Sequence, residues 1–232
     1  MEIDKNNIKF FSVVSGLDKN YLSIKNNFQQ HLKKINILEQ HEVIKTNTHS
    51  GNWQEKGFIN TVYKKLDYTR EFLKKGRFVF CTDLDIVYLK DPIPYLIEQM
   101  EINNYDILFQ HDYAKDGDKI FSVYCTGFYL VRPTKINIKL FDLSYNFFKR
   151  SNKIIFQDNE EKSDQNYINT KLKQKRFRNL KIGLLDKNLF PNGWCWKKYN
   201  TQIDPFIIHY NCIEGGIEGK IKEMKKFKHW IV

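Results

Sequence analysis

The stretch GRFVFCTDLDIVYLKDP, residues 76–92, places two aspartates where a buried strand should still be running. An apolar run ends at Cys81, Asp83 and Asp85 follow, and the chain then returns to apolar residues. Burying a charge costs on the order of several kcal/mol unless the charge is paired or bound to a metal. Either the strand therefore ends at Thr82 and the two aspartates lie in a turn, or their carboxylates bind something.

The surrounding sequence predicts an α/β fold in which strands and helices alternate through the first half. Strands are predicted at 8–14, 41–46, 77–81, 106–110, 120–132, 181–186 and 205–210. Helices are predicted at 21–35, 58–73, after Pro92, at 135–150, at 163–172 with a capping serine, and from near Gly215. In open sheets of this kind, ligands bind outside the carboxyl ends of the strands, which is where Asp83 and Asp85 fall.

The bulk composition limits the classes of protein that fit. A chain of 232 residues suits a single domain, 1–232. The net charge of +11 is compatible with an acidic partner, but the lysines are scattered, which favours surface composition over one binding face. The four cysteines form no C-x-x-C pair, and neither a signal-peptide core nor a long apolar span is visible. We therefore expect a cytoplasmic protein without a membrane span.

The spacing of Asp83 and Asp85 is suited to holding a cation. In extended chain, residues two apart point to the same side, so both carboxylates can face one ligand. Hard oxygen ligands suit Mg²⁺ or Mn²⁺, which typically bind one or two carboxylates together with substrate phosphates. A second D-x-D, Asp116 and Asp118, has Gly117 between its aspartates and is interpreted as a turn.

Two enzyme classes use such a pair of aspartates after an apolar strand. In a haloacid-dehalogenase-type phosphohydrolase Asp83 would be the nucleophile, but no later acidic pair ends a strand to complete the Mg²⁺ site. In a GT-A glycosyltransferase the carboxylates hold a cation against the diphosphate of a nucleotide sugar. A third interpretation, a basic nucleic-acid-binding protein, has the net charge in its favour and no recognisable binding motif.

The C-terminal segment IIHYNCIEGGIEGK adds groups suited to a phosphate ligand. His209 ends a predicted strand and could complete a metal site from across the cleft. Gly215 and Gly216 allow close approach of the backbone to a phosphate, and Lys220 supplies a countercharge. This combination favours the glycosyltransferase over the phosphohydrolase.

With these pieces together, the chain resembles the nucleotide-diphospho-sugar transferase family of GT-A glycosyltransferases over roughly residues 8–230. The pieces occur in the order FFSVVSG, a basic residue in the second helix, DLDIVYLKDP, TGFYLVRP, SDQNYIN, LFPNGW and HYNCIEGGIEGK. The long D-x-D-x-V-x-L-x-D-P pattern and the FPNGW stretch are much more specific than the two aspartates alone.

The resemblance implies a single GT-A domain, Rossmann-like, with a mixed open sheet flanked by helices. Its nucleotide-binding half would be about 1–110, and its acceptor and sugar half about 111–232. It implies a metal-dependent transferase that uses Mn²⁺ or Mg²⁺ and moves a sugar from a nucleotide-sugar donor, most simply a UDP-sugar, to a glycan or other hydroxyl acceptor. Retention of the anomeric configuration is favoured at the level of the family, and nucleic acid is not an expected partner.

The resemblance also implies roles for individual residues. The metal ligands would be Asp83, Asp85 and His209. The catalytic carboxylate beside the anomeric carbon would be Asp164, with Asp112 or the substrate itself as the alternative. The residues expected to contact the donor are Val13, Val14, Ser15, Lys65, Asp83, Gly127, Gln165, Asn211, Gly215 and Lys220.

One departure concerns the donor sugar. Relatives often carry Asn two residues before the glycine of the GF pair, where this chain has Cys125 before Gly127. That Asn usually touches the hydroxyls of the sugar, so the resemblance does not extend to the identity of the sugar.

Overall fold

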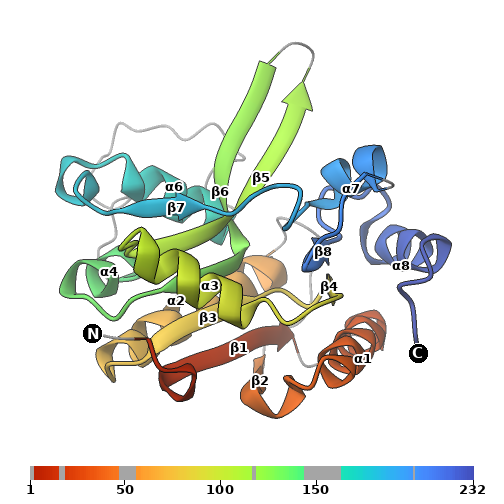
Figure 1. The fold of residues 1–232 in the computed structure, drawn as a ribbon, viewed down its shortest axis with the longest axis horizontal. Helices are drawn as coiled ribbons and strands as arrows, with labels where there is room; N and C mark the ends of the chain where they lie inside the picture. Colours follow the sequence, from red (N-terminus) through yellow and green to blue (C-terminus); the bar gives the residue numbers. More distant parts are fainter. Residues whose placement is uncertain (1–2, 16–18, 47–55, 117–118, 144–162, 201) are drawn as a thin grey trace.

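A six-stranded sheet forms the centre of the computed structural model, which describes residues 3–15, 19–46, 56–116, 119–143, 163–200 and 202–232 (Figure 1). The strand order is β2-β1-β3-β6-β5-β7. The strands are β1 (Ile8–Ser15), β2 (His41–Thr46), β3 (Phe78–Thr82), β5 (Ile107–Asp116), β6 (Lys119–Val131) and β7 (Ile182–Leu184). The predicted mixed, open sheet flanked by helices is confirmed.

The sheet is parallel except at β6. The pairs β1–β2, β1–β3 and β5–β7 are parallel, whereas β6 is antiparallel to both β3 and β5. The carboxyl ends of β1 and β3 therefore lie at the same edge, beside the start of the D-x-D segment. β5 is longer than predicted, and the β5–β6 hairpin projects beyond the body of the molecule (Figure 1).

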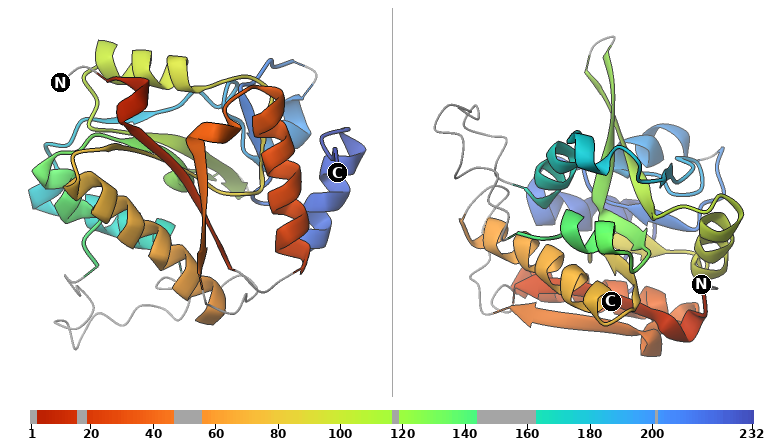
Figure 2. Two further views of the ribbon diagram at one scale, coloured as in Figure 1. Left: turned by 90° about the horizontal axis from the view of Figure 1, so that it is seen from below. Right: turned by 90° about the vertical axis from the view of Figure 1, so that its left-hand side faces the viewer.

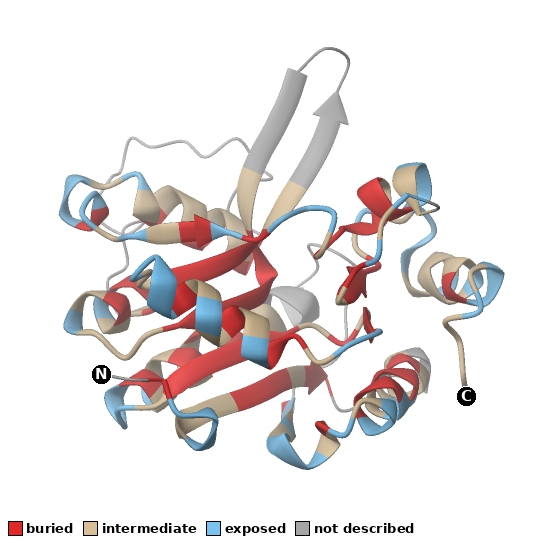
Figure 3. Cartoon of the chain, in the orientation of Figure 1, coloured by how far each residue is buried: buried red, intermediate tan, exposed pale blue. Residues whose placement is uncertain are grey.

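Helices cover both faces of the sheet because successive strand residues alternate between two cores. The first core packs Phe10, Phe80 and Leu130 against α1 (Lys19–Lys34) and α3 (Ile93–Ile102). The second packs strand residues such as Phe11 and Val79 against the helices on the other face. These are α2 (Lys56–Lys74), α4 (Lys135–Leu140) and α6 (Asp164–Leu172), and Figures 2 and 3 show this layering and the buried sheet.

Two short elements were not predicted, one directly after the D-x-D segment and one in the FPNGW stretch. β4 (Ile86–Tyr88) pairs antiparallel with β8 (Ile207–His209) in a separate two-stranded sheet. The FPNGW stretch begins α7 (Gly193–Tyr199), where the Asn192 side chain caps the helix by accepting from Cys195 N. Short 3₁₀ helices complete the described chain at Lys5–Asn7, Leu38–Gln40 and Lys175–Phe177.

The C-terminal segment fastens α8 (Gly216–Lys226) to α1. The Asn27 amide donates to His229 O at 3.1 Å and accepts from Ile231 N at 2.8 Å. His31 lies between two carbonyl oxygens, Tyr88 O at 3.2 Å and His229 O at 2.8 Å. α1 and α8 are thereby held on the same side of the D-x-D segment.

The predicted starts of two helices agree with the structure, and two other predictions fall partly on residues outside the described chain. The capping serine of α6 is Ser163, whose hydroxyl accepts from Asn166 N, and α8 begins next to Gly215 as predicted. The predicted helix at 135–150 is α4 over its first six residues, and residues 144–162 lie outside the described chain. Gly117 and Asp118 of the second D-x-D also lie outside it. All four cysteines are free, and none of the described helices is long and apolar enough to cross a membrane.

Candidate functional site

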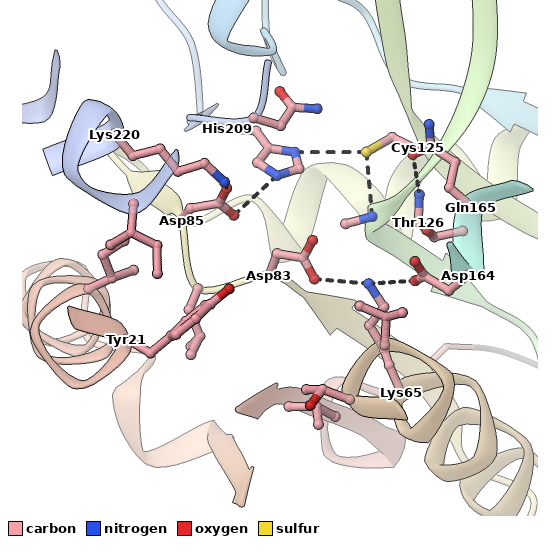
Figure 4. Close-up of a pocket in the computed structure, with 18 of the residues that line it drawn as sticks. Tyr21, Lys65, Asp83, Asp85, Cys125, Thr126, Asp164, Gln165, His209 and Lys220 are labelled. Atoms are coloured by element: carbon pink, nitrogen blue, oxygen red, sulfur yellow. Dashed lines mark hydrogen bonds and ion pairs between the residues drawn. The ribbon is translucent and has the colours of Figure 1, made fainter. Parts of the chain in front are cut away.

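A cavity of about 540 Å³ lies where β1 and β3 end, between α1, α2 and α8 (Figure 4). It collects nearly all the residues singled out from the sequence. Those that line it are Val13, Val14, Ser15, Lys65, Asp83, Asp85, Gly127, Asp164, Gln165, His209, Asn211 and Lys220. Gly215 is not among the lining residues; it precedes α8 with φ of +84°, and its neighbour Gly216 lines the cavity instead.

The D-x-D segment is the link between the two sheets. β3 ends at Thr82, and Asp83 N donates to Gly127 O of β6 at 2.7 Å. Leu84 and Asp85 form a turn, after which β4 pairs Ile86 with His209 of β8. The strand therefore ends at Thr82, as the first alternative states. The turn that follows brings the carboxylates of Asp83 and Asp85 next to the imidazole of His209.

Asp83, Asp85 and His209 form a three-residue cluster suited to a cation. One ligand atom from each lies within 4.8 Å of the other two. Two carboxylates and an imidazole are a donor set that Mn²⁺ accepts, and Mg²⁺ accepts the oxygens. His209 is buried, and both aspartates are partly exposed to the cavity. A cation bound by these three residues would therefore also be open to a ligand in the cavity.

Asp85 lies between the Lys220 ammonium group and the His209 imidazole. Its Oδ1 lies 3.2 Å from His209 Nε2, and its Oδ2 accepts from Lys220 Nζ at 2.7 Å. Burial alone would raise the pKa of Asp85, but the Lys220 ammonium and His209 outweigh burial and hold that pKa well below its ordinary range. Asp85 is therefore an anion throughout the neutral pH range, as a metal ligand must be.

Lys65, on α2, lies between the carboxylates of Asp83 and Asp164 (Figure 4). Its Nζ lies 2.9 Å from Asp83 Oδ1 and 2.7 Å from Asp164 Oδ2. Burial alone would lower the pKa of Lys65, but Asp164 and Asp83 outweigh it and raise that pKa well above its ordinary value. Lys65 thus fixes Asp164, the first residue of α6, at the wall of the cavity.

Gly127 leaves space that the cluster needs. A Cβ at this position would lie 2.4 Å from His209 Cε1 and 2.7 Å from Asp83 Oδ2. Both distances are shorter than any normal contact, so a side chain here would displace two of the three candidate ligands. The resemblance implied that Gly127 contacts the donor; in the structure this glycine leaves room for Asp83 and His209.

Asp112, on β5, is the centre of a polar network that the sequence did not reveal. Its Oδ2 accepts from Gln165 Nε2 at 2.9 Å. Its Oδ1 accepts from Asn192 Nδ2 at 3.1 Å and from Asn211 Nδ2 at 3.2 Å. Its donors are far apart in the chain, and the only sequence signal was a carboxylate soon after the apolar run DILF.

The charges of the cavity do not balance. Among its described lining residues, the four carboxylates of Asp83, Asp85, Asp112 and Asp164 face only two ammonium groups, Lys65 and Lys220. An anionic ligand such as a diphosphate would meet excess negative charge there. A divalent cation beside Asp83 and Asp85 would remove that repulsion.

Comparison with known proteins identifies the family. The family model described as nucleotide-diphospho-sugar transferase matches residues 16–224. The chain belongs to this family. The family predicted from the sequence is thereby confirmed, and this match gives the phosphohydrolase alternative no support.

Two curated relatives of this family member are sugar transferases. One is a UDP-galactose:fucoside alpha-3-galactosyltransferase of Dictyostelium discoideum, 32% identical over 168 residues that cover 62% of this chain. The other is the UDP-D-xylose:L-fucose alpha-1,3-D-xylosyltransferase MGP4 of Arabidopsis thaliana, 28% identical over 193 residues that cover 76% of this chain. The matched regions span 24% and 51% of those relatives' own lengths.

Solved structures share the fold. A glycosyltransferase involved in the glycosylation of the major capsid of PBCV-1 matches with a TM-score of 0.59 and 11% identity, over 94% of this chain and 98% of that one. An active-site mutant of LgtC matches with a TM-score of 0.50 and 11% identity, over 94% and 95% of the two chains. At such low identity these likenesses concern the fold alone, and they agree with the predicted GT-A architecture.

The contact geometry of Gly127 generates a prediction for this family member. Gly127→Ala should weaken Mn²⁺ binding by about 10-fold or more, because the added Cβ displaces both His209 and Asp83. Calorimetry with Mn²⁺ in the presence of UDP measures the affinity, and thermal unfolding shows whether the variant is folded. A folded variant with the affinity of the parent protein would contradict the role assigned to this glycine.

Proposed function

We propose that this chain is a glycosyltransferase that binds a UDP-sugar together with Mn²⁺ or Mg²⁺ and transfers the sugar to a hydroxyl group of a glycan acceptor. The observation that carries the proposal is the cluster of Asp83, Asp85 and His209 beside Lys220 in one cavity. Family membership and the names of the curated relatives support it.

Asp83, Asp85 and His209 would hold the cation. When bound, it would neutralise charge on the diphosphate and make the nucleoside diphosphate a better leaving group. Lys220, at 2.7 Å from Asp85 Oδ2, is close enough to share this task with its ammonium group. The excess of carboxylates in the cavity supports a requirement for metal, since the diphosphate would otherwise enter a site of its own sign.

The remaining lining residues divide the cavity between nucleotide and sugar. Val13, Val14 and Ser15, at the end of β1, would line the pocket for the base, and the start of α8 would lie beside the diphosphate. On the opposite wall Gln165 donates to Asp112, so both would contact the sugar or its acceptor as parts of one hydrogen-bonded network.

Asp164 would be the carboxylate beside the anomeric carbon. The sugar becomes positively charged as the leaving group departs, and a fixed carboxylate stabilises that charge or adds to the carbon as a nucleophile. The Asp164 side chain is only 6% exposed and is held in place by Lys65, whose Nζ lies 2.7 Å from Asp164 Oδ2. The relatives' names describe α-linked products, which supports retention for an α-linked donor.

The relatives' names also suggest substrates to test. Both use a UDP-sugar, galactose in one case and xylose in the other, and both name fucose or a fucoside as acceptor. We propose UDP-galactose or UDP-xylose as donor and a fucoside as acceptor. Cys125 lies in the cavity wall where relatives often carry Asn, so the choice between the two sugars cannot be carried over from the family pattern.

A binding panel tests the proposal directly. Thermal unfolding is followed with UDP, GDP, CDP and dTDP sugars, each in Mn²⁺, and transfer of galactose or xylose to a fucoside is then measured with the donor that stabilises the protein. We expect UDP-sugars to raise the melting temperature by several degrees, because a ligand that binds only the folded state stabilises it. Stabilisation by none of these donors would contradict the proposal.

A substitution at Asp164 tests its role in the reaction. Asp164→Asn should lower turnover per folded molecule by orders of magnitude while leaving UDP binding in Mn²⁺ nearly unchanged. The melting temperature should also fall, because Lys65 would keep only one of its two carboxylate partners. Turnover, corrected for the folded fraction, is therefore the measurement that decides.

Asp142→Asn is the matched control for this variant. Asp142 pairs with Arg70 at 3.0 Å and does not line the cavity, so its loss should lower stability and leave turnover intact. If Asp164→Asn behaves in the same way, Asp164 serves only to stabilise the first turn of α6 and to pair with Lys65, and the catalytic group must be sought at Asp112 or on the substrate.

A further inference from the structure

Gln110 is a buried amide next to the metal cluster and outside the set of candidate ligands. It is fully buried on β5, at the point where the register of β5 against β6 shifts between Phe109 and Gln110. Such irregularities change the direction of a side chain relative to the regular alternation and recur beside active sites. Here the side chain reaches His209, which lies 99 positions further along the chain.

Two backbone carbonyls fix the orientation of the Gln110 amide. Its Nε2 donates to Phe190 O at 3.0 Å and to Pro191 O at 3.3 Å. Carbonyl oxygens only accept hydrogen bonds, so the amide group that faces them must be the NH₂. A rotated amide would set its own oxygen against both carbonyls and leave these buried acceptors without a donor, which costs about 1–3 kcal/mol.

This orientation decides which nitrogen of His209 carries the proton. Gln110 Oε1, an acceptor, lies 2.7 Å from His209 Nδ1, so Nδ1 must be the N–H donor. The other neighbour of Nδ1, the Cys125 sulfur, is 3.8 Å away and is a much weaker partner. In the neutral imidazole the lone pair is then on Nε2, the atom that faces Asp85.

The alternative tautomer would block the cluster. His209 Nε2 lies 3.2 Å from Asp85 Oδ1, close enough for an N–H on Nε2 to donate to that carboxylate. Such a bond would occupy both the imidazole nitrogen and the carboxylate oxygen that a cation needs. Gln110 competes against it by offering the proton an acceptor at a shorter distance, 2.7 Å, on the opposite side of the ring.

We propose that Gln110 is a positioning residue that keeps the proton of His209 on Nδ1 and thereby leaves Nε2 and Asp85 free to bind the cation. This inference rests on the metal-dependent function proposed above. The FPNGW stretch takes part, because Pro191 O accepts from both the Gln110 amide and the backbone N–H of His209, which lies 3.0 Å away. The Pro191 carbonyl thus helps to orient both the Gln110 amide and His209, the residue whose tautomer Gln110 selects.

The test combines a spectroscopic and a binding measurement on the full chain. Imidazole ¹⁵N shifts of the metal-free protein, taken at the alkaline end of a pH series where they no longer change, report the neutral tautomer. A His209→Gln spectrum identifies the resonances of His209. We expect a proton on Nδ1 in the parent protein, and in Gln110→Met a shift of the proton toward Nε2 with Mn²⁺ affinity about 10- to 100-fold weaker.

Asn137→Leu is the matched control. Asn137 is also fully buried, and its Nδ2 donates to two backbone carbonyls, Asp106 O at 3.1 Å and Arg132 O at 2.8 Å. It lies outside the cavity, so its loss should destabilise the fold without changing the His209 resonances or the Mn²⁺ affinity.

The outcomes separate this inference from the function on which it rests. A proton on Nε2 in the parent protein, or an unchanged tautomer in Gln110→Met, would overturn the role of Gln110, and the first of these needs no variant to fold. A parent protein that binds no Mn²⁺ would overturn the proposed metal dependence, while the ¹⁵N shifts would still decide whether Gln110 places the proton.

Discussion

The compensation of buried carboxylates is the constraint on which the site depends. Asp85 and Asp164 at the end of the sheet are largely removed from bulk water and Asp83 is partly so, and each has a cationic partner. Lys65 serves Asp83 and Asp164, and Lys220 serves Asp85. The fold must bring α2, α6 and α8 to one edge of the sheet for these pairs to form, which is what the two cores on either face of the sheet achieve.

The D-x-D segment takes its conformation from the two sheets that it connects. Had β3 continued, alternate side chains would have entered the two apolar cores. Instead the chain leaves the large sheet at Thr82, turns through Leu84 and Asp85, and enters the small sheet at Ile86. Pairing of β4 with β8 then sets Asp85 beside His209, and the Asp91 side chain accepts from Ile93 N at 2.9 Å to begin α3. The aspartates of the long motif thus each have a structural task.

Much of the fold and most of the residues that line the cavity could be predicted from the sequence, because apolar periodicity and motif order are local properties. The strands at 8–14 and 77–81 appeared nearly where expected, and the motifs led to the residues that line the cavity. β8 falls within the strand predicted at 205–210, but β4 spans three residues and α7 seven, too few to show a period. Gln110 resembled any polar residue at the end of a strand, and the shift in register that points it at His209 depends on pairing with β6, which no local pattern reports.

Calorimetry of UDP binding tests the central claim most directly, which is that the carboxylate-rich cavity accepts a nucleoside diphosphate only with a divalent cation. UDP is titrated into the parent protein in Mn²⁺ and in EDTA, and into Asp85→Asn in Mn²⁺. The account predicts measurable binding only for the parent protein in Mn²⁺, since the amide keeps the shape of Asp85 but loses the charge that holds the cation. Equal affinity in Mn²⁺ and in EDTA would contradict it.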